Sequence, residues 1–247
     1  MKIKIINPNT TAAMTDSIWQ AAVGAARPGT EILCVSPATG PASIECYVDD
    51  YLAVQGVIAE VLKGEREEGA DAYVIACFGD PGLQAARELT DKPVLGIAEA
   101  AMAMATVLAP SFSVVSVLDR SVKVTQDLVL AYGKERFCRS VRATGLGVLE
   151  FADREKGMRA LEAQSRLAVE QDGAECILLG CAGFVDFMRA LNESLGVPVL
   201  DGVVPAVAMA QAMVDIGLRT SKHNTWKYPE PKAFVGFEHL DINGEGV

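Results

Sequence analysis

Two cysteines occupy equivalent positions in two similar segments of the chain, residues 69–82 and 173–184. A glycine, an alanine, an acidic residue, an apolar run and a cysteine match between the segments without a gap, so Cys77 corresponds to Cys181. Each cysteine ends a short apolar run, which is typical of a strand buried on both faces in a parallel sheet. The pattern therefore predicts a thiol at the C-terminal end of each of two buried strands.

A pair of thiols in these positions can move a proton onto and off a carbon atom. A thiol has a reference pKa of about 8.5, and a nearby helix N-terminus lowers it. Because each cysteine precedes a predicted helix by a few residues, we expect either to be held as a thiolate without a neighbouring histidine. If the two strand ends face each other, one thiolate removes a proton from an acidic C–H and the opposing thiol returns one to the other face. That chemistry inverts a stereocentre without a cofactor.

The intermediate in such a reaction is an enolate, whose oxygens gain negative charge. The backbone N–H groups of residues 78–80 and 182–183 follow the two cysteines, and we expect them to stabilise that charge. Gly79 and Gly183 lie at matching positions in the two segments, two residues after each cysteine. Because glycine has no Cβ, these residues allow the backbone to approach a ligand closely.

The similarity continues beyond the cysteines and predicts two α/β halves. Each segment leads through a predicted helix to a Pro-Val-Leu strand, at residues 93–95 and 198–200, and then to an Ala/Met-rich helix. Such self-similarity indicates a repeated structural unit, and in open parallel sheets ligands bind outside the carboxyl ends of the strands. We therefore predict an α/β fold of two pseudo-symmetric parallel-sheet lobes with the site in the cleft between them. The predicted domains are residues 1–98 with 206–247, and residues 99–205.

The remaining elements are predicted from apolar runs and cap signals. Predicted strands cover residues 2–6, 31–35, 111–118 and 141–146. The first is followed by Asn7-Pro8-Asn9-Thr10, a turn in which Asn9 or Thr10 caps the next helix. Asp80 followed by Pro81 predicts a helix that begins there, with Asp80 as its N-cap and proline at the first helical position. From about residue 217 the chain has no hydrophobic period and is predicted to run along the surface.

Composition excludes several classes of partner and site. The chain has 247 residues, 50% of them hydrophobic, and a formal net charge of -10, which argues against a nucleic acid or an anionic membrane as partner. Without a secretory signal or a membrane span, we expect a cytoplasmic protein whose six cysteines are thiols. The only two histidines, His223 and His239, lie in the tail and no Cys-x-x-Cys occurs. We therefore expect neither a metal site nor a cofactor.

Several uncommon motifs occur in an order that resembles one family. They are INPNTT, GPASIE with the acidic pair Asp49-Asp50 after it, ACFGDPGL, GIAEA, LGCAGF and VPVLDGV. Together they resemble the hydantoin racemases of the Asp/Glu/hydantoin racemase superfamily over nearly the entire chain. The resemblance implies two pseudo-symmetric lobes with the site between them, cofactor-independent racemisation of 5-monosubstituted hydantoins, and a homo-oligomer, expected to be a tetramer or hexamer. It also implies that Cys77 and Cys181 are the two catalytic acid/bases. Cys46 departs from the pattern, because a small or polar residue is expected there, and its role stays open.

The residues beside the cysteines favour a neutral ring as substrate. Amino-acid racemases that resemble this fold usually place Asn, Thr or Ser after the cysteines to hold a carboxylate and an ammonium, whereas this chain has Phe78 and Ala182. An imide ring bonded by backbone amides, with an apolar 5-substituent against Ile44, Phe78 and Phe184, fits better. Allantoin racemase is the nearest alternative, although allantoin's polar ureido arm needs donors and acceptors where the chain offers mostly apolar groups. The predicted substrate-binding residues are Asn9, Ile44, Phe78, Gly79, Asp80, Val117, Ala182, Gly183 and Phe184.

Other interpretations of the same residues are open. A two-lobed α/β protein is compatible with a small-molecule sensor, or with a redox switch in which Cys77 and Cys181 form a disulfide. An amino-acid racemase is a further alternative, and a decarboxylase is disfavoured because it needs only one cysteine. Asn9 is explained as well by a turn as by ligand binding, and Asp80 better as an N-cap than as a catalyst. Three other cysteines are expected in the core: Cys34, Cys138 and Cys176.

Overall fold

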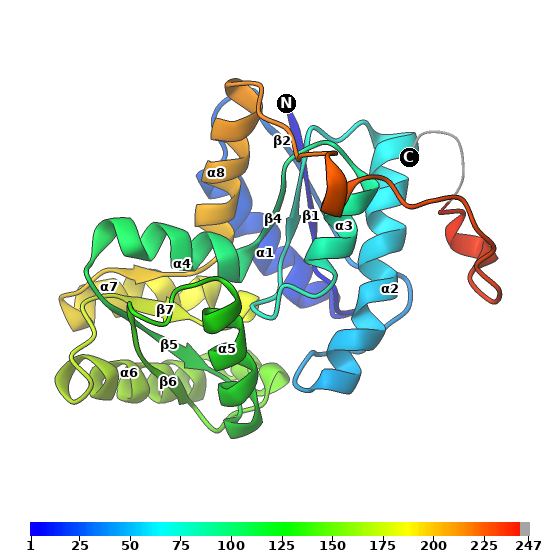
Figure 1. Cartoon of the computed structure of the whole chain (residues 1–247). Coiled ribbons are helices and arrows are strands. Elements are labelled where there is room, and N and C mark those ends of the chain that lie inside the picture. The colour runs from blue at the N-terminus through cyan, green and yellow to red at the C-terminus, as the bar shows by residue number, and fades with distance from the viewer. Residues whose placement is uncertain (243–247) are drawn as a thin grey trace.

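The first lobe is a four-stranded parallel sheet covered by helices (Figure 1). In the computed structural model, which describes residues 1–242, its strands lie in the order β2-β1-β3-β4. The strands are β1 (Lys2–Ile6), β2 (Glu31–Val35), β3 (Ala72–Ile75) and β4 (Val94–Gly96); the helices after the first three are α1 (Ala12–Ala25), α2 (Tyr47–Lys63, continued as a π-helix over Gly64–Glu68) and α3 (Leu83–Leu89). Every residue of β3 is buried, as expected for a central parallel strand with helices on both faces.

The second lobe repeats this arrangement with the strand order β6-β5-β7-β8, also parallel. Its strands are β5 (Phe112–Ser116), β6 (Cys138–Ala143), β7 (Ile177–Leu179) and β8 (Val199–Leu200); its helices are α5 (Asp119–Ala131), α6 (Arg154–Glu170) and α7 (Met188–Leu195), with 3-10 helices at Val148–Ala152 and Ala182–Phe187. The two orders are the same when β1 is matched to β5 and β3 to β7. The prediction of an α/β fold with two pseudo-symmetric parallel-sheet lobes is confirmed.

Two helices connect the lobes, and each packs in a core of the lobe opposite to the strand it follows. Helix α4 (Ile97–Leu108) follows β4 of the first lobe, and its Met102 packs with Val114 and Leu178 in a core of the second lobe. Helix α8 (Val203–Asp215) follows β8 of the second lobe and packs with β1 and β3 of the first. We keep residues 1–98 with 206–247 and residues 99–205 as proposed domains, whose boundaries lie near these two crossings.

Asp80 caps a helix, although not the one that the sequence predicts. Helix α3 begins at Leu83, after Gly82, and the backbone of Asp80 is left-handed with a φ of 48°. The Asp80 carboxylate instead accepts hydrogen bonds from the backbone N–H groups of Ala98 (3.1 Å) and Glu99 (3.0 Å), in the first turn of α4. The predicted helix start at Asp80-Pro81 is therefore wrong, because the left-handed turn directs the carboxylate across to α4.

A hydrogen bond from the second lobe completes the surroundings of Asp80. Tyr132, directly after α5, donates its hydroxyl to Asp80 Oδ2 at 2.6 Å. Burial raises the pKa of Asp80 to about 7, although the hydrogen bonds from Tyr132, Ala98 and Glu99 lower it. This contact joins the loop after Cys77 to the second lobe.

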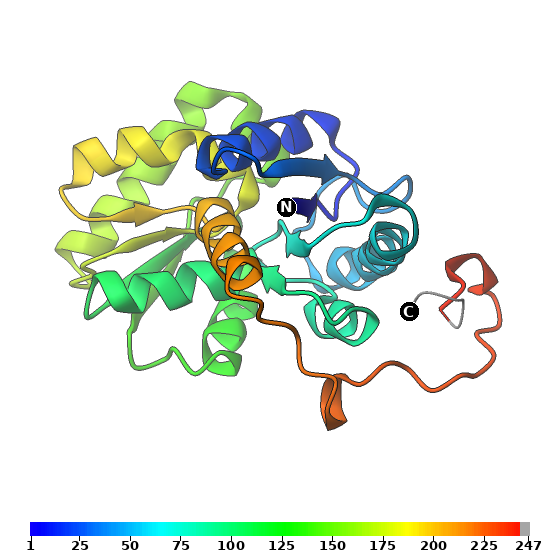
Figure 2. The ribbon, with the colours of Figure 1, turned by 90° about the horizontal axis from the view of Figure 1, so that it is seen from above.

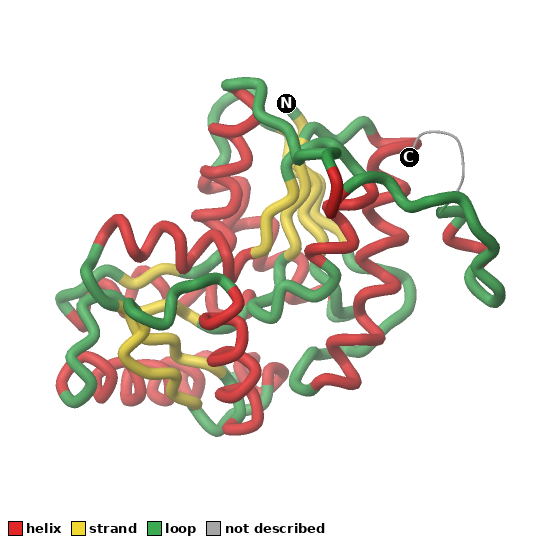
Figure 3. Tube along the Cα trace, in the orientation of Figure 1, coloured by secondary structure: helices red, strands yellow, loops and turns green. Residues whose placement is uncertain are grey.

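The segment after α8 runs over the first lobe, mostly as loop (Figures 2 and 3). Thr220 donates its N–H to Asp91 O at 2.7 Å, and the Trp226 indole N–H donates to Gln84 at 2.9 Å. The predicted surface course is confirmed up to residue 242, and its last residues, 243–247, lie outside the described residues. Within residues 1–242, no helix combines the length and apolar character needed to cross a membrane.

Replacing Tyr132 with phenylalanine tests the contact between the lobes. The pKa of Asp80 in the folded chain, about 7, lies above its usual 3.8, so its contribution to stability is present below pH 4 and is lost as the pH rises through 7. Tyr132→Phe removes a donor from the carboxylate, which raises this pKa further. We expect the free energy of unfolding to fall by about 1.5–3 kcal/mol at pH 8.5, where Asp80 is ionised, and by about 1 kcal/mol at pH 5.5.

Urea denaturation of both proteins at both pH values measures this difference. Tyr51→Phe is the matched control, because it keeps the ring and removes a hydroxyl that makes no hydrogen bond within the described residues. An equal loss of unfolding free energy at the two pH values would contradict a hydrogen bond from the Tyr132 hydroxyl to an ionised Asp80.

Candidate active site

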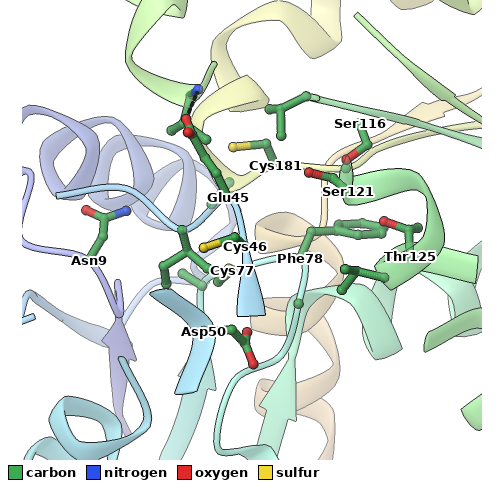
Figure 4. Close-up of a pocket in the computed structure, with 18 of the residues that line it drawn as sticks. Asn9, Glu45, Cys46, Asp50, Cys77, Phe78, Ser116, Ser121, Thr125 and Cys181 are labelled. Carbon is green, nitrogen blue, oxygen red and sulfur yellow. Dashed lines mark hydrogen bonds between the residues drawn. The ribbon is translucent and has the colours of Figure 1, made fainter. Parts of the chain in front are cut away.

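Cys77 and Cys181 line one pocket between the lobes (Figure 4). Cys77 follows β3 and Cys181 follows β7, so both thiols stand at the C-terminal ends of matched central strands. The empty space of the pocket, counted together with the open solvent at its mouth, is about 700 Å³. Its lining is Asn9, Met14, Ile44, Glu45, Cys46, Tyr47, Asp50, Ala76, Cys77, Phe78, Gly79, Ser116, Val117, Ser121, Val124, Thr125, Val148, Gly180, Cys181 and Ala182. The duplicated strands therefore bring the two predicted acid/base residues to the same cavity.

A glycine two residues further along the chain lies close to each sulfur. A Cβ on Gly79 would stand 3.9 Å from Cys77 Sγ, and a Cβ on Gly183 would stand 3.6 Å from Cys181 Sγ. Hydrogen bonds from the Gly79 and Gly183 backbones lower the pKa values of Cys77 and Cys181 respectively. Both glycines thus stabilise the thiolate form of the cysteine two residues before them.

Burial nevertheless outweighs these hydrogen bonds. Desolvation raises the pKa of both thiols, to about 11 for Cys181, and the neighbouring Glu45 carboxylate raises it there as well. At Cys77 the charges of Cys181, Asp50 and Asp80 add to the effect of burial. We expected helix N-termini to lower the pKa of these thiols. That expectation is wrong, because burial raises the pKa of both by more than the backbone lowers it. A thiolate with a raised pKa is less populated at neutral pH but is a stronger base.

Six of the nine predicted substrate-binding residues line the pocket and three do not. Asn9, Ile44, Phe78, Gly79, Val117 and Ala182 belong to its wall. Gly183 stands behind the Cys181 sulfur, and Asp80 is turned toward α4. Phe184 is fully buried in the second lobe, with its ring 4.4 Å from that of Phe151. Phe184 cannot contact a 5-substituent in this arrangement, because its ring lies on the core side of the 3-10 helix.

Asn9 has the role in the turn that the sequence suggested, and it also lies in the wall of the pocket. Its Oδ1 accepts hydrogen bonds from Asn7 Nδ2 (3.0 Å) and from the backbone N–H of Thr11 (2.9 Å), which fixes the turn after β1. Its Nδ2 donates to Met14 Sδ at 3.1 Å. Since Asn9 also lines the pocket, this turn holds one of the polar groups of the cavity.

Sequence reasoning missed the polar groups that enter from other segments. Ser116, Ser121 and Thr125 come from the end of β5 and from α5, and their hydroxyls make no hydrogen bond within the described residues. The only signal for them is that residues 116–121 correspond to the turn after β1 in the other half. Cys46, whose role the sequence left open, also faces this pocket.

The segment before α2 reaches across the pocket to the second lobe. Glu45 Oε1 accepts the backbone N–H of Val148 at 2.6 Å, and Asp50 follows in the first turn of α2. The motif GPASIE and the acidic pair after it marked this segment, although without a role for either carboxylate. Among residues 1–242, no group of three or more His, Cys, Asp or Glu side chains is placed to hold a metal ion.

The family of the chain follows from comparison with known proteins. Residues 3–210 match the family described as Asp/Glu/Hydantoin racemase. The chain is 56% identical over 237 residues to a hydantoin racemase of Pseudomonas sp. (strain NS671). The aligned region covers 96% of this chain and 95% of that protein.

Two solved structures are similar over nearly the whole chain. Allantoin racemase from Klebsiella pneumoniae is 45% identical with a TM-score of 0.94, covering 97% of this chain and 98% of its own. Allantoin racemase from Pseudomonas fluorescens is 39% identical with a TM-score of 0.92, covering 96% and 100%. The chain is therefore an isomerase and belongs to the Asp/Glu/Hydantoin racemase family.

Proposed function

We propose that this enzyme racemises 5-monosubstituted hydantoins at C5, by proton transfer between two thiols and without a cofactor. The observation that carries the proposal is the pair Cys77 and Cys181, which open on one pocket from matched strand ends, each with a glycine N–H at its sulfur. The name of the 56% identical relative from Pseudomonas sp., hydantoin racemase, supports the substrate class.

The reaction needs one thiolate and one thiol on opposite faces of the ring. The thiolate takes the C5 proton, and the electron pair of the C–H bond moves toward the adjacent ring carbonyl, giving an enolate. The opposing thiol then donates its proton to C5 from the other face. The product has the inverted configuration, and the two sulfurs have exchanged protonation states. No group is oxidised or reduced, so atoms and charge balance.

Two backbone N–H groups are available for the enolate oxygens. The Gly79 and Gly183 N–H groups are directed at the sulfurs, and the Asp80 N–H is bonded to Cys77 O at 3.0 Å. The N–H groups of Phe78 and Ala182 make no hydrogen bond within residues 1–242. We propose that these two donors stabilise the enolate, because a preorganised donor gains most where charge develops.

Allantoin is the second candidate substrate. Phe184, which we expected to contact an apolar substituent, is fully buried and does not line the pocket. The hydroxyls of Ser116, Ser121 and Thr125 do line it, and they make no hydrogen bond within the described residues. A polar ureido arm would find donors and acceptors there. The 45% identical structure from Klebsiella pneumoniae is named allantoin racemase, which supports the same alternative.

Enantiopure substrates in deuterated buffer test the function. We expect the optical activity of a 5-alkylhydantoin to decay with deuterium incorporated at C5, and allantoin, run beside it, to decay more slowly. A faster decay of allantoin would make allantoin the preferred substrate by the same mechanism. If neither compound lost optical activity or exchanged hydrogen, the carbanion mechanism for hydantoins would be excluded, and amino-acid racemisation, ligand sensing or a redox role would take its place.

Replacing each thiol separately tests the two-base mechanism. In Cys77→Ser and in Cys181→Ser we expect racemisation to fall by at least about 10³-fold, because a serine hydroxyl is a much weaker acid than a thiol and its anion is not populated at neutral pH. Each variant should still exchange the C5 proton of one enantiomer only, the one whose C–H faces the remaining thiol. Polarimetry and mass spectrometry on each enantiomer measure the two effects. Full activity in either variant would contradict the mechanism, and Cys138→Ser is the control for replacing a cysteine outside the pocket.

We also propose that the enzyme is cytoplasmic and a homo-oligomer of four or six chains. The apolar side chains of Tyr47, Val48, Tyr51 and Leu52 are exposed together at the start of α2, which supports burial against another chain. Light scattering should give four or six times the chain mass of 26.2 kDa, and a monomer would contradict the proposal.

A further inference from the structure

The surroundings of the two sulfurs differ at one position of an otherwise repeated arrangement. On the Cys77 side, a Cβ on Gly79 would stand 3.0 Å from Asp50 Oδ1. On the Cys181 side, a Cβ on Gly183 would stand 3.5 Å from Cε of Met14. Both points lie within 4 Å of the catalytic sulfur. The carboxylate that lies beside Gly79 is therefore replaced by a methyl group beside Gly183.

The other ionisable groups near the sulfurs are one further pocket thiol, one phenol and two carboxylates. Cys77 is influenced by Cys181, Asp50 and Asp80, and Cys181 by Glu45. Cys46 and Tyr47, at the start of α2, line the same pocket, and its described lining contains no Lys, Arg or His. The two thiols therefore compete for a single negative charge among groups that are neutral or anionic.

Hydrogen bonds offset the charge of two of the three carboxylates. Asp80 accepts from two N–H groups of α4 and from the Tyr132 hydroxyl. Glu45 accepts the N–H of Val148 at 2.6 Å. The carboxylate of Asp50 accepts no hydrogen bond within the described residues. Its charge therefore acts on Cys77 with no donor to offset it, in a pocket where the local dielectric is lower than in water.

We propose that Asp50 disfavours the thiolate at Cys77, so that Cys181 is the first of the two thiols to ionise in the free enzyme, with Cys181 as the base and Cys77 as the acid. Asp50 acts through Cys77 and contacts no reacting atom. The roles of base and acid rest on the proposed function, whereas the order in which the thiols ionise does not. The free enzyme is then ready for the enantiomer whose C5–H faces Cys181, and the other enantiomer requires the less stable form with a thiolate at Cys77.

Alkylation of each cysteine with iodoacetamide tests this order without the use of a substrate. The thiolate sulfur displaces iodide, forming one C–S bond and breaking one C–I bond, and the neutral reagent is not itself repelled by Asp50. Rates for each cysteine are measured by peptide mass spectrometry between pH 6 and 10. In the unmodified sequence we expect Cys181 to react faster than Cys77. In Asp50→Asn we expect the rate at Cys77, relative to Cys181, to rise by about tenfold, with the Cys77 pH profile shifted to lower pH.

Glu45→Gln is the matched control, because Glu45 acts on the other sulfur and glutamine keeps the acceptor for Val148. It should raise the rate at Cys181 and leave that at Cys77 unchanged. Cys176, which is fully buried, reports folding in every sample, since it is alkylated only if the chain unfolds. Where Asp50→Asn exposes Cys176, the measurement is made on Asp50→Ser.

Two results would overturn the proposal: faster alkylation of Cys77 in the unmodified sequence, or an unchanged ratio of the two rates in the Asp50 variant. A chain that shows the expected order but racemises no hydantoin would leave the order of ionisation standing and remove the proposed substrate.

Discussion

The balance between desolvation and a neighbouring glycine backbone at each of the two half-buried cysteines is the constraint on which the chemistry of the pocket depends. Burial disfavours the thiolates at Cys77 and Cys181, and within the described residues no cationic side chain lines the pocket to offset it. The N–H groups of Gly79 and Gly183 favour the charged form. A Cβ at either glycine would stand within 4 Å of the sulfur, so glycine keeps this side of each thiol open. The outcome is a thiolate that is a strong base because it is poorly stabilised.

The two-fold repeat of the fold matches the geometry that racemisation requires. A planar carbanion must be approached from both faces, and β3 and β7 each deliver one thiol to a common cavity. The lobes are joined on several sides: α4 and α8 each pack against the opposite sheet, Tyr132 bonds to Asp80, and Glu45 bonds to Val148. These contacts join the two lobes whose strands β3 and β7 carry the thiols.

Local patterns in the sequence predict the strands and the thiols well and predict the pocket wall less completely. The ends of β1 and β2 coincide with the predicted ranges, since an apolar run bounded by a turn is a local signal. Asp80 was recognised as a cap, but which helix it caps depends on a left-handed turn that local pattern does not specify. Phe184 lies close to Cys181 in sequence but points into the core, while Ser116 and Asp50 reach the pocket only through the packing of the lobes. The pKa of the thiols was misjudged for a similar reason, because burial is a tertiary property and outweighs the local effect of the backbone.

An unequal pair of thiols is compatible with a reaction that has no preferred direction. Two enantiomers in an achiral solvent have equal free energies, so the equilibrium constant of racemisation is one and kcat/KM must be the same for both. Asp50 beside Cys77 and Met14 beside Cys181 can therefore not make the enzyme more efficient in one direction. The asymmetry can change only the separate values of kcat and KM, because their ratio is the same for both enantiomers. Under the proposed assignment, the enantiomer that meets the Cys181 thiolate would have the lower KM, and its kcat would be lower in the same proportion, because its product leaves behind the less stable form of the enzyme.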